Sequence, residues 1–145
     1  MEFTQPLANA VPAYEKGDVI GRARRLVMDR GWSSLANDTK WNQLITTMRV
    51  QKEWRPSYRY KSIDGLPSQW DVEWWYHLPF PFIYVQWFDI GCIEKKQSGT
   101  HVAAEYIDRS DWIENLLTEF GFDFKKSTDF YRIFGYYPRN MDLFE

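Results

Sequence analysis

Polar and apolar residues alternate along residues 70–78, and an apolar pattern continues through residues 82–90; the whole stretch reads WDVEWWYHLPFPFIYVQWFDI. Alternation with period two is typical of a strand with one buried face. The second segment is apolar on both faces except for Gln86 and Asp89, which favours a central strand covered on both sides. Prolines separate the two segments and cannot donate to a sheet, so we predict two strands joined by a proline-bracketed turn.

Three other stretches repeat with the period of a helix. The first is expected to run from an N-cap at Asp18 to Gly31, because glycine favours the left-handed conformation that ends many helices. The second and third carry apolar stripes that should pack on the sheet, and the third should end at Gly121. The second helix should be capped by Asn37 or Asp38, and its apolar stripe is Trp41, Leu44, Ile45 and Met48. The third should be capped by Asp108 or Ser110, and its stripe is Trp112, Ile113, Leu116, Leu117 and Phe120.

Further strands are expected at residues 54–63, 122–124 and 130–137, with a polar loop at residues 91–104. Gly135, inside the last strand, indicates a bulge or a close approach of another backbone segment. Short turns join neighbouring strands, so the sheet should be mainly antiparallel. The sequence therefore predicts an α+β fold, with about five strands and three helices packed on them. Residues 1–15 are expected to form a flexible N-terminal arm and residues 16–145 a single domain.

The composition narrows the class of protein. Aromatic residues make up 19% of the 145 residues, and most are expected in the core. A net charge of −2 argues against a general nucleic-acid binder, although Arg22, Arg24, Arg25 and Arg30 gather on the first helix. The one cysteine, Cys92, excludes an internal disulfide and favours a reducing, cytoplasmic location. We expect no membrane span and no signal peptide, because the chain lacks a long apolar run and the N-terminus lacks an apolar signal core.

Candidate catalytic groups are few. The two histidines, His77 and His101, lack the paired spacing of a metal site. Asp71 and Glu73 share one face of the predicted strand, as paired carboxylates in acid–base catalysis do, but solvated carboxylates on an exposed face give the same pattern. Cys92 lies between apolar neighbours, which disfavour a reactive thiolate. The sequence therefore predicts no catalytic residue, no bound metal and no cofactor.

The polar face of the first strand is the strongest candidate for a binding surface. An exposed tryptophan inside an acidic rim is typical of a protein-binding hot spot, and its carboxylates would attract a basic partner. The alternative is that a helix covers Trp75 and that the carboxylates are ordinary surface. The predicted partner-binding residues are Asp71, Glu73, Trp75 and His77 on this face, with Asp89 and Glu94 near the end of the neighbouring strand.

Four segments, TKWNQL (residues 39–44), WDVEWWYHLP (70–79), QWFDI (86–90) and RIFGY (132–136), together resemble an uncharacterised family of small bacterial proteins. The resemblance covers roughly residues 38–137 and leaves out the first helix and the arm. It implies a small cytoplasmic bacterial protein with no assigned activity. In length, acidity and aromatic content the chain is also similar to the immunity proteins that neutralise antibacterial toxins, which is a likeness of kind.

We therefore expect an interaction protein, most specifically an immunity protein that binds and inhibits a cognate toxin. A basic nuclease domain is one such toxin, since nuclease sites are basic in order to hold phosphate. The alternative is a small-molecule binding module or enzyme whose aromatic pocket, with Asp71, Glu73 and His77, takes a sugar or nucleobase. Direct nucleic-acid binding is the least favoured hypothesis because of the net charge.

Overall fold

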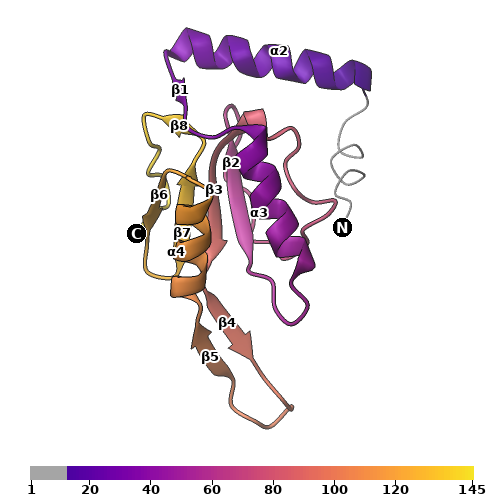
Figure 1. The fold of residues 1–145 in the computed structure, drawn as a ribbon, viewed down its shortest axis with the longest axis vertical. Coiled ribbons are helices and arrows are strands. Elements are labelled where there is room, and N and C mark those ends of the chain that lie inside the picture. The colour runs from indigo at the N-terminus through magenta and orange to yellow at the C-terminus, as the bar shows by residue number, and fades with distance from the viewer. Residues whose placement is uncertain (1–12) are drawn as a thin grey trace.

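The computed structural model describes the backbone of residues 13–145 and the side chains from Asp18 onward (Figure 1). The fold is α+β, as the sequence predicts. Its helices are α2 (Ala13–Arg30), α3 (Asp38–Val50) and α4 (Ser110–Glu119), with a 3₁₀ turn, η1 (Phe82–Tyr84). Its strands are β1 (Ser33–Ser34), β2 (Tyr58–Ser62), β3 (Val85–Gly91), β4 (Ile93–Lys96), β5 (Glu105–Asp108), β6 (Phe124–Lys126), β7 (Phe130–Phe134) and β8 (Tyr136–Tyr137).

The central sheet has four antiparallel strands in the order β2-β3-β7-β6. Every residue of β3 from Val85 to Ile90 is buried, which confirms the prediction of a central strand covered on both sides. Residues 82–84, expected to begin this strand, instead form η1. The two short pairs β1-β8 and β4-β5 stand outside the central sheet.

Helices α3 and α4 pack on one face of the central sheet (Figure 1). All four residues of the predicted α3 stripe are buried, and in α4 the stripe is buried at Ile113 and Leu117 and partly buried at its other positions. The Trp41 ring is the centre of this layer, with its centroid 4.9 Å from Phe82 and 5.2 Å from Phe122. The helical period therefore identified the core face of both helices.

The helix ends follow local rules in most places. Asn37 caps α3, where its side-chain oxygen accepts a hydrogen bond of 2.9 Å from the amide of Lys40. Gly31 and Gly121 follow α2 and α4 with φ of 67° and 75°, the left-handed conformation expected of them. No helix within residues 13–145 is both long and apolar enough to cross a membrane.

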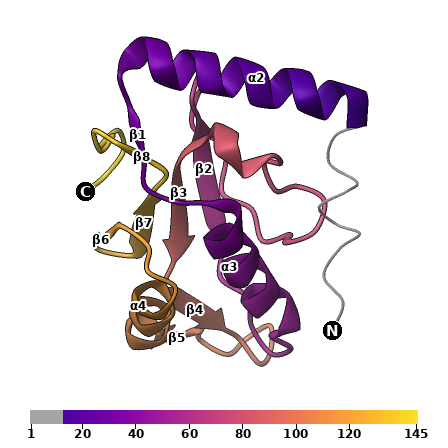
Figure 2. The same cartoon turned by 45° about the horizontal axis from the view of Figure 1, so that its top comes forward.

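The predicted start of the first helix is wrong. Helix α2 begins at Ala13, five positions before the expected cap at Asp18, so it includes the last residues of the expected arm. The remainder of that arm, residues 1–12, lies outside the described residues. Helix α2 crosses one end of the domain, above η1 and the β1-β8 pair (Figure 2).

The predicted strand at residues 70–78 does not form. Only Asp71 in this segment pairs with a strand, through an isolated bridge to Tyr58. The two neighbours of β3 in the sheet are β2 and β7, so the hairpin predicted between residues 70–78 and 82–90 is also wrong. The cause is local: carboxylates within the segment accept hydrogen bonds from its backbone amides, which competes with ladder formation.

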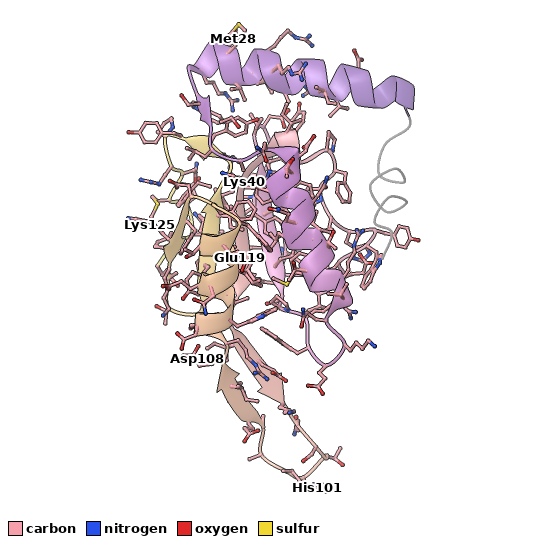
Figure 3. All side chains as sticks on the ribbon, viewed as in Figure 1. Met28, Lys40, His101, Asp108, Glu119 and Lys125 are labelled. Carbon is pink, nitrogen blue, oxygen red and sulfur yellow. The ribbon has the colours of Figure 1, made fainter. Side chains whose placement is uncertain are left out.

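The loop predicted at residues 91–104 is largely a hairpin. Strand β4 pairs with β5 from Ile93 opposite Asp108 to Lys96 opposite Glu105. The hairpin extends away from the body of the domain (Figure 1), and Figure 3 shows His101 at its tip. The sequence missed these strands because most of their side chains are exposed and lack an alternating apolar face.

Gly135 marks a close approach of two backbone segments, as predicted. A Cβ atom at this position would lie 2.2 Å from the carbonyl oxygen of Val85, which is far inside van der Waals contact. The Gly135 amide donates to the Gln86 carbonyl at 2.9 Å and its own carbonyl accepts from Leu35 at 2.8 Å. The glycine therefore lets the chain pass from β7 to β8 against β3.

Candidate functional site

Most of the strand predicted at residues 70–78 lies in an internally braced loop, defined here as residues 66–77. Asp71 provides the first brace. Its Oδ1 accepts from the amides of Val72 at 2.7 Å and Glu73 at 2.9 Å, and its Oδ2 lies 2.8 Å from the His77 ring nitrogen Nδ1. Burial acts to raise the pKa of the Asp71 carboxyl, but the backbone and His77 hydrogen bonds outweigh it, and the net pKa is lowered.

Glu73 provides the second brace. Its Oε1 accepts from three successive amides, those of Trp75 at 3.1 Å, Tyr76 at 2.7 Å and His77 at 2.8 Å. The Glu73 carbonyl also accepts a hydrogen bond from the buried hydroxyl of Tyr58. Three of the six predicted binding residues, Asp71, Glu73 and His77, therefore come together, and the two carboxylates bind the backbone amides of the loop.

The braced loop exposes large apolar side chains. Leu66 is 89% exposed, Val72 66% and Tyr76 71%, and Trp70 is also exposed. Val72, Tyr76 and Trp70 were expected on the buried face of a strand, so their placement is a correction. An exposed large apolar residue is unremarkable alone, whereas several on one short loop are typical of an interaction site.

Trp75, the predicted exposed anchor, is half-buried. Its ring packs against the core, and the ring centre lies 4.8 Å from the Arg55 guanidinium and 5.6 Å from that of Arg49. Burial lowers the pKa of Arg49 to about 10, and the nearby Glu73 charge offsets part of that effect. Arg49 also donates to the Trp74 carbonyl at 2.6 Å, so this arginine pins the braced loop to the end of α3.

The predicted rim position of Asp89 is wrong, because its side chain is fully buried on the sheet face opposite α3 and α4. Arg132 contacts it twice, at 2.7 Å and 2.9 Å, and Arg59 once at 2.8 Å. The Arg132 guanidinium lies 3.7 Å from the centre of the Trp87 ring and donates to the Asn140 carbonyl at 3.0 Å. This cluster of one carboxylate and two arginines is the charged centre of that face.

Glu94 is also buried rather than at a rim. Its Oε1 accepts from Nε of Arg109 at 2.9 Å and from Nη2 at 2.5 Å. The sequence could not show these pairs, because Asp89 and Arg132 are 43 residues apart and Glu94 and Arg109 are 15 apart. Register across the strands brings the first pair together, since Asp89 lies opposite both Arg59 and Arg132.

Chemistry-bearing side chains are dispersed. In the described part of the chain, no three His, Cys, Asp or Glu residues are grouped closely enough to hold a metal ion. Cys92 is fully buried, as its apolar flanks predict, with its sulfur 3.4 Å from the Ser110 hydroxyl. His101 and His77 are far apart in the chain and lie on different structural elements.

A separate groove of about 770 Å³ lies between α2 and the body of the domain. Its walls come from α2, the start of α3, η1 and the β7–β8 junction. None of Asp71, Glu73 and His77, the residues of the predicted aromatic pocket, lines this groove. The groove was invisible in the sequence because it lies between elements that are far apart in the chain.

The fold places the chain among α+β proteins, and its candidate site is a loop that exposes apolar side chains. More particularly, the chain belongs to a family of unknown function, DUF6678, whose model matches residues 23–140. The match begins inside α2, so the second half of that helix, which the sequence resemblance left out, is part of the family's shared region. No curated protein and no solved structure matches the chain.

Proposed function

We propose that this chain is an interaction protein that binds a protein partner through the braced loop. One observation carries the proposal: residues 71–77, whose amides are bound by the carboxylates of the same segment, expose Val72 and Tyr76, and Leu66 of the same loop is exposed as well. Apolar side chains displayed on a preordered loop bind with a small entropic cost, because the loop need not be ordered on association. Tyrosine is also enriched among the residues that dominate binding energy.

The partner that best fits this surface is a basic protein. The chain has a net charge of −2, and the side chain of Asp71 is still 34% exposed after its internal hydrogen bonds. Carboxylates near an apolar anchor raise the rate of association with a cationic surface. The more specific proposal is a cytoplasmic bacterial immunity protein that inhibits a cognate toxin. The chain's size, acidity and aromatic content support it by likeness of kind.

The test requires a partner and two tyrosine variants. Proteins encoded beside this gene are expressed, and their binding to the purified chain is measured by calorimetry. In any complex found, Tyr76→Ala should weaken binding by about 30-fold, the equivalent of about 2 kcal/mol for a hot-spot residue. Its melting temperature should not change, because the side chain is exposed.

Tyr106→Ala is the matched control. Tyr106 is 65% exposed, comparable to Tyr76, but lies on β5 in the projecting hairpin. We expect this variant to bind as the parent does. A complex that tolerates Tyr76→Ala and is weakened by Tyr106→Ala would move the binding surface to the hairpin and refute the assignment of the braced loop.

A further inference from the structure

The groove beneath α2 has the size and walls of a ligand site. Its volume of about 770 Å³ lies within the range of about 300–1,000 Å³ that small-molecule sites occupy. Figure 2 shows α2 lying across one end of the domain. The residues that line the groove come from α2 and from η1, the start of α3 and the β7–β8 junction. Met28 is among the lining residues but is 79% exposed, and Figure 3 shows it on the side of α2 that faces away from the body.

Aromatic residues form part of the inner surface of the groove. Trp41 and Phe82 contribute one pair, with centroids 4.9 Å apart, and Trp32 and Tyr136 contribute another, with centroids 6.0 Å apart. All four residues line the groove, and the rings of both pairs are tilted rather than stacked. A planar aromatic ligand would find offset and edge-to-face partners there.

Two charged residues line the groove from opposite walls, Arg24 from α2 and Asp38 from α3. Burial raises the pKa of the Tyr136 hydroxyl to about 12, and the charges of Arg24 and Asp38 lower and raise it respectively, so both lie within electrostatic reach of the same group. Asp38 occupies the first turn of α3, where a carboxylate compensates the positive end of the helix dipole.

The positive charge of Arg24 is not compensated by a partner among the described residues. Throughout the part of the chain that the structure describes, it forms no hydrogen bond and no ion pair, whereas Arg22 on the same helix is paired with Asp64 at 2.8 Å. An unpaired guanidinium at an aromatic groove is complementary to an anion attached to a ring, because a carboxylate accepts from its two parallel N–H donors.

We infer that this groove binds a small planar aromatic anion, with the ring among Trp41, Phe82 and Tyr136 and the acidic group on Arg24. The inference is independent of the protein-binding role proposed for the braced loop, because none of the residues of that loop lines the groove. It assigns a ligand class to the chain: an aromatic carboxylic acid or a chemically equivalent ring-bearing anion.

Three indole probes test which ligand charge the groove prefers: the anion indole-3-propionate, the cation tryptamine and the neutral 3-methylindole. Binding is followed by ¹H–¹⁵N spectra of the tryptophan indole N–H groups during titration. We expect saturable shifts at Trp32 and Trp41. Trp74 should be unmoved, since its indole N–H donates to the Pro56 carbonyl at 2.9 Å away from the groove. Indole-3-propionate should bind more tightly than both other probes.

The charge contact is tested by Arg24→Gln against Arg25→Gln. Both arginines are exposed on α2, but Arg25 does not line the groove. Arg24→Gln should weaken indole-3-propionate about tenfold and leave 3-methylindole unchanged, as the loss of one charge-assisted contact implies. Tryptamine binding best, equal losses in the two variants, or no saturable shift at Trp32 and Trp41 would each overturn the inference.

Discussion

Replacing Asp89 with asparagine should be among the most damaging single substitutions in this protein. The wild-type carboxylate makes three contacts of 2.7–2.9 Å with the guanidinium groups of Arg132 and Arg59. Asparagine keeps the shape but removes the negative charge, so the fully buried guanidinium of Arg132 loses its counter-ion. The neutral Asn140 carbonyl and the rings of Trp87, Phe144 and Phe130 remain near it. Breaking one side of a buried ion pair costs about 3–5 kcal/mol.

The assay is urea unfolding followed by tryptophan fluorescence, with the melting temperature as a second measure. A loss of about 4 kcal/mol should lower the melting temperature by about 10 °C in a domain of this size. Asp123→Asn is the matched control. Asp123 also forms a two-contact pair with an arginine, Arg139, at 2.7 Å for both contacts, but on the surface. Such a pair contributes about 0–1 kcal/mol.

A second variant separates loss of charge pairing from loss of packing. Replacing both partners, with Asp89→Leu and Arg132→Met, removes the unpaired charge and should recover most of the stability lost by Asp89→Asn. Arg59 can then turn outward, because its side chain is already 14% exposed. If Asp89→Asn is no more destabilising than Asp123→Asn, the reasoning is refuted, and the buried cluster is not an electrostatic unit.

Two further predictions concern the close backbone approach and the braced loop. Gly135→Ala should destabilise the domain by about 2–4 kcal/mol in urea unfolding, because its Cβ would meet the Val85 carbonyl oxygen at 2.2 Å; Gly99→Ala, whose Cβ would meet only the Val102 methyl at 3.5 Å, should be neutral, and equal effects would contradict the prediction. The hydrogen bonds of Asp71 lower its pKa in the folded state, so its contribution to stability is present above the unfolded value near 3.8 and is lost as the pH falls through the lowered folded value. The difference in melting temperature between the wild type and Asp71→Asn should therefore be larger at pH 7 than at pH 2.5, and a pH-independent difference would rule out this titration.

Local rules determined a large part of the fold. The i, i+3, i+4, i+7 stripe of α3 predicted its buried face, because a helix of regular period can bury only one side against a sheet. Gly31 and Gly121 predicted two helix ends through their tolerance of positive φ. The apolar run of β3, broken only by Gln86 and Asp89, predicted a central strand, since a polar side chain there needs a buried partner.

Asp89, a charged residue within that apolar run, shows which features local rules cannot predict. Asp89 looked like a surface carboxylate because its partners are absent from its own neighbourhood in the sequence. Strand register places Arg59 and Arg132 directly opposite it on either side, and the paired charges can then be buried. The decisive information is a set of pairings between strands, which alternation within one strand does not encode.

The braced loop and the groove depend on tertiary structure in the same way. Residues 70–78 alternate like a strand, but both edges of β3 are occupied by β2 and β7, and the carboxylates of Asp71 and Glu73 take up the amides that a ladder would have used. That choice exposes Val72 and Tyr76. The groove needs α2 to lie across η1 and α3, elements brought together only by folding. The sequence by itself determined helices α3 and α4, strand β3 and their buried faces, because those follow from local backbone geometry. The braced loop and the groove were decided by tertiary structure, because segments distant in the sequence provide the hydrogen bonds, charges and apolar surfaces that form them.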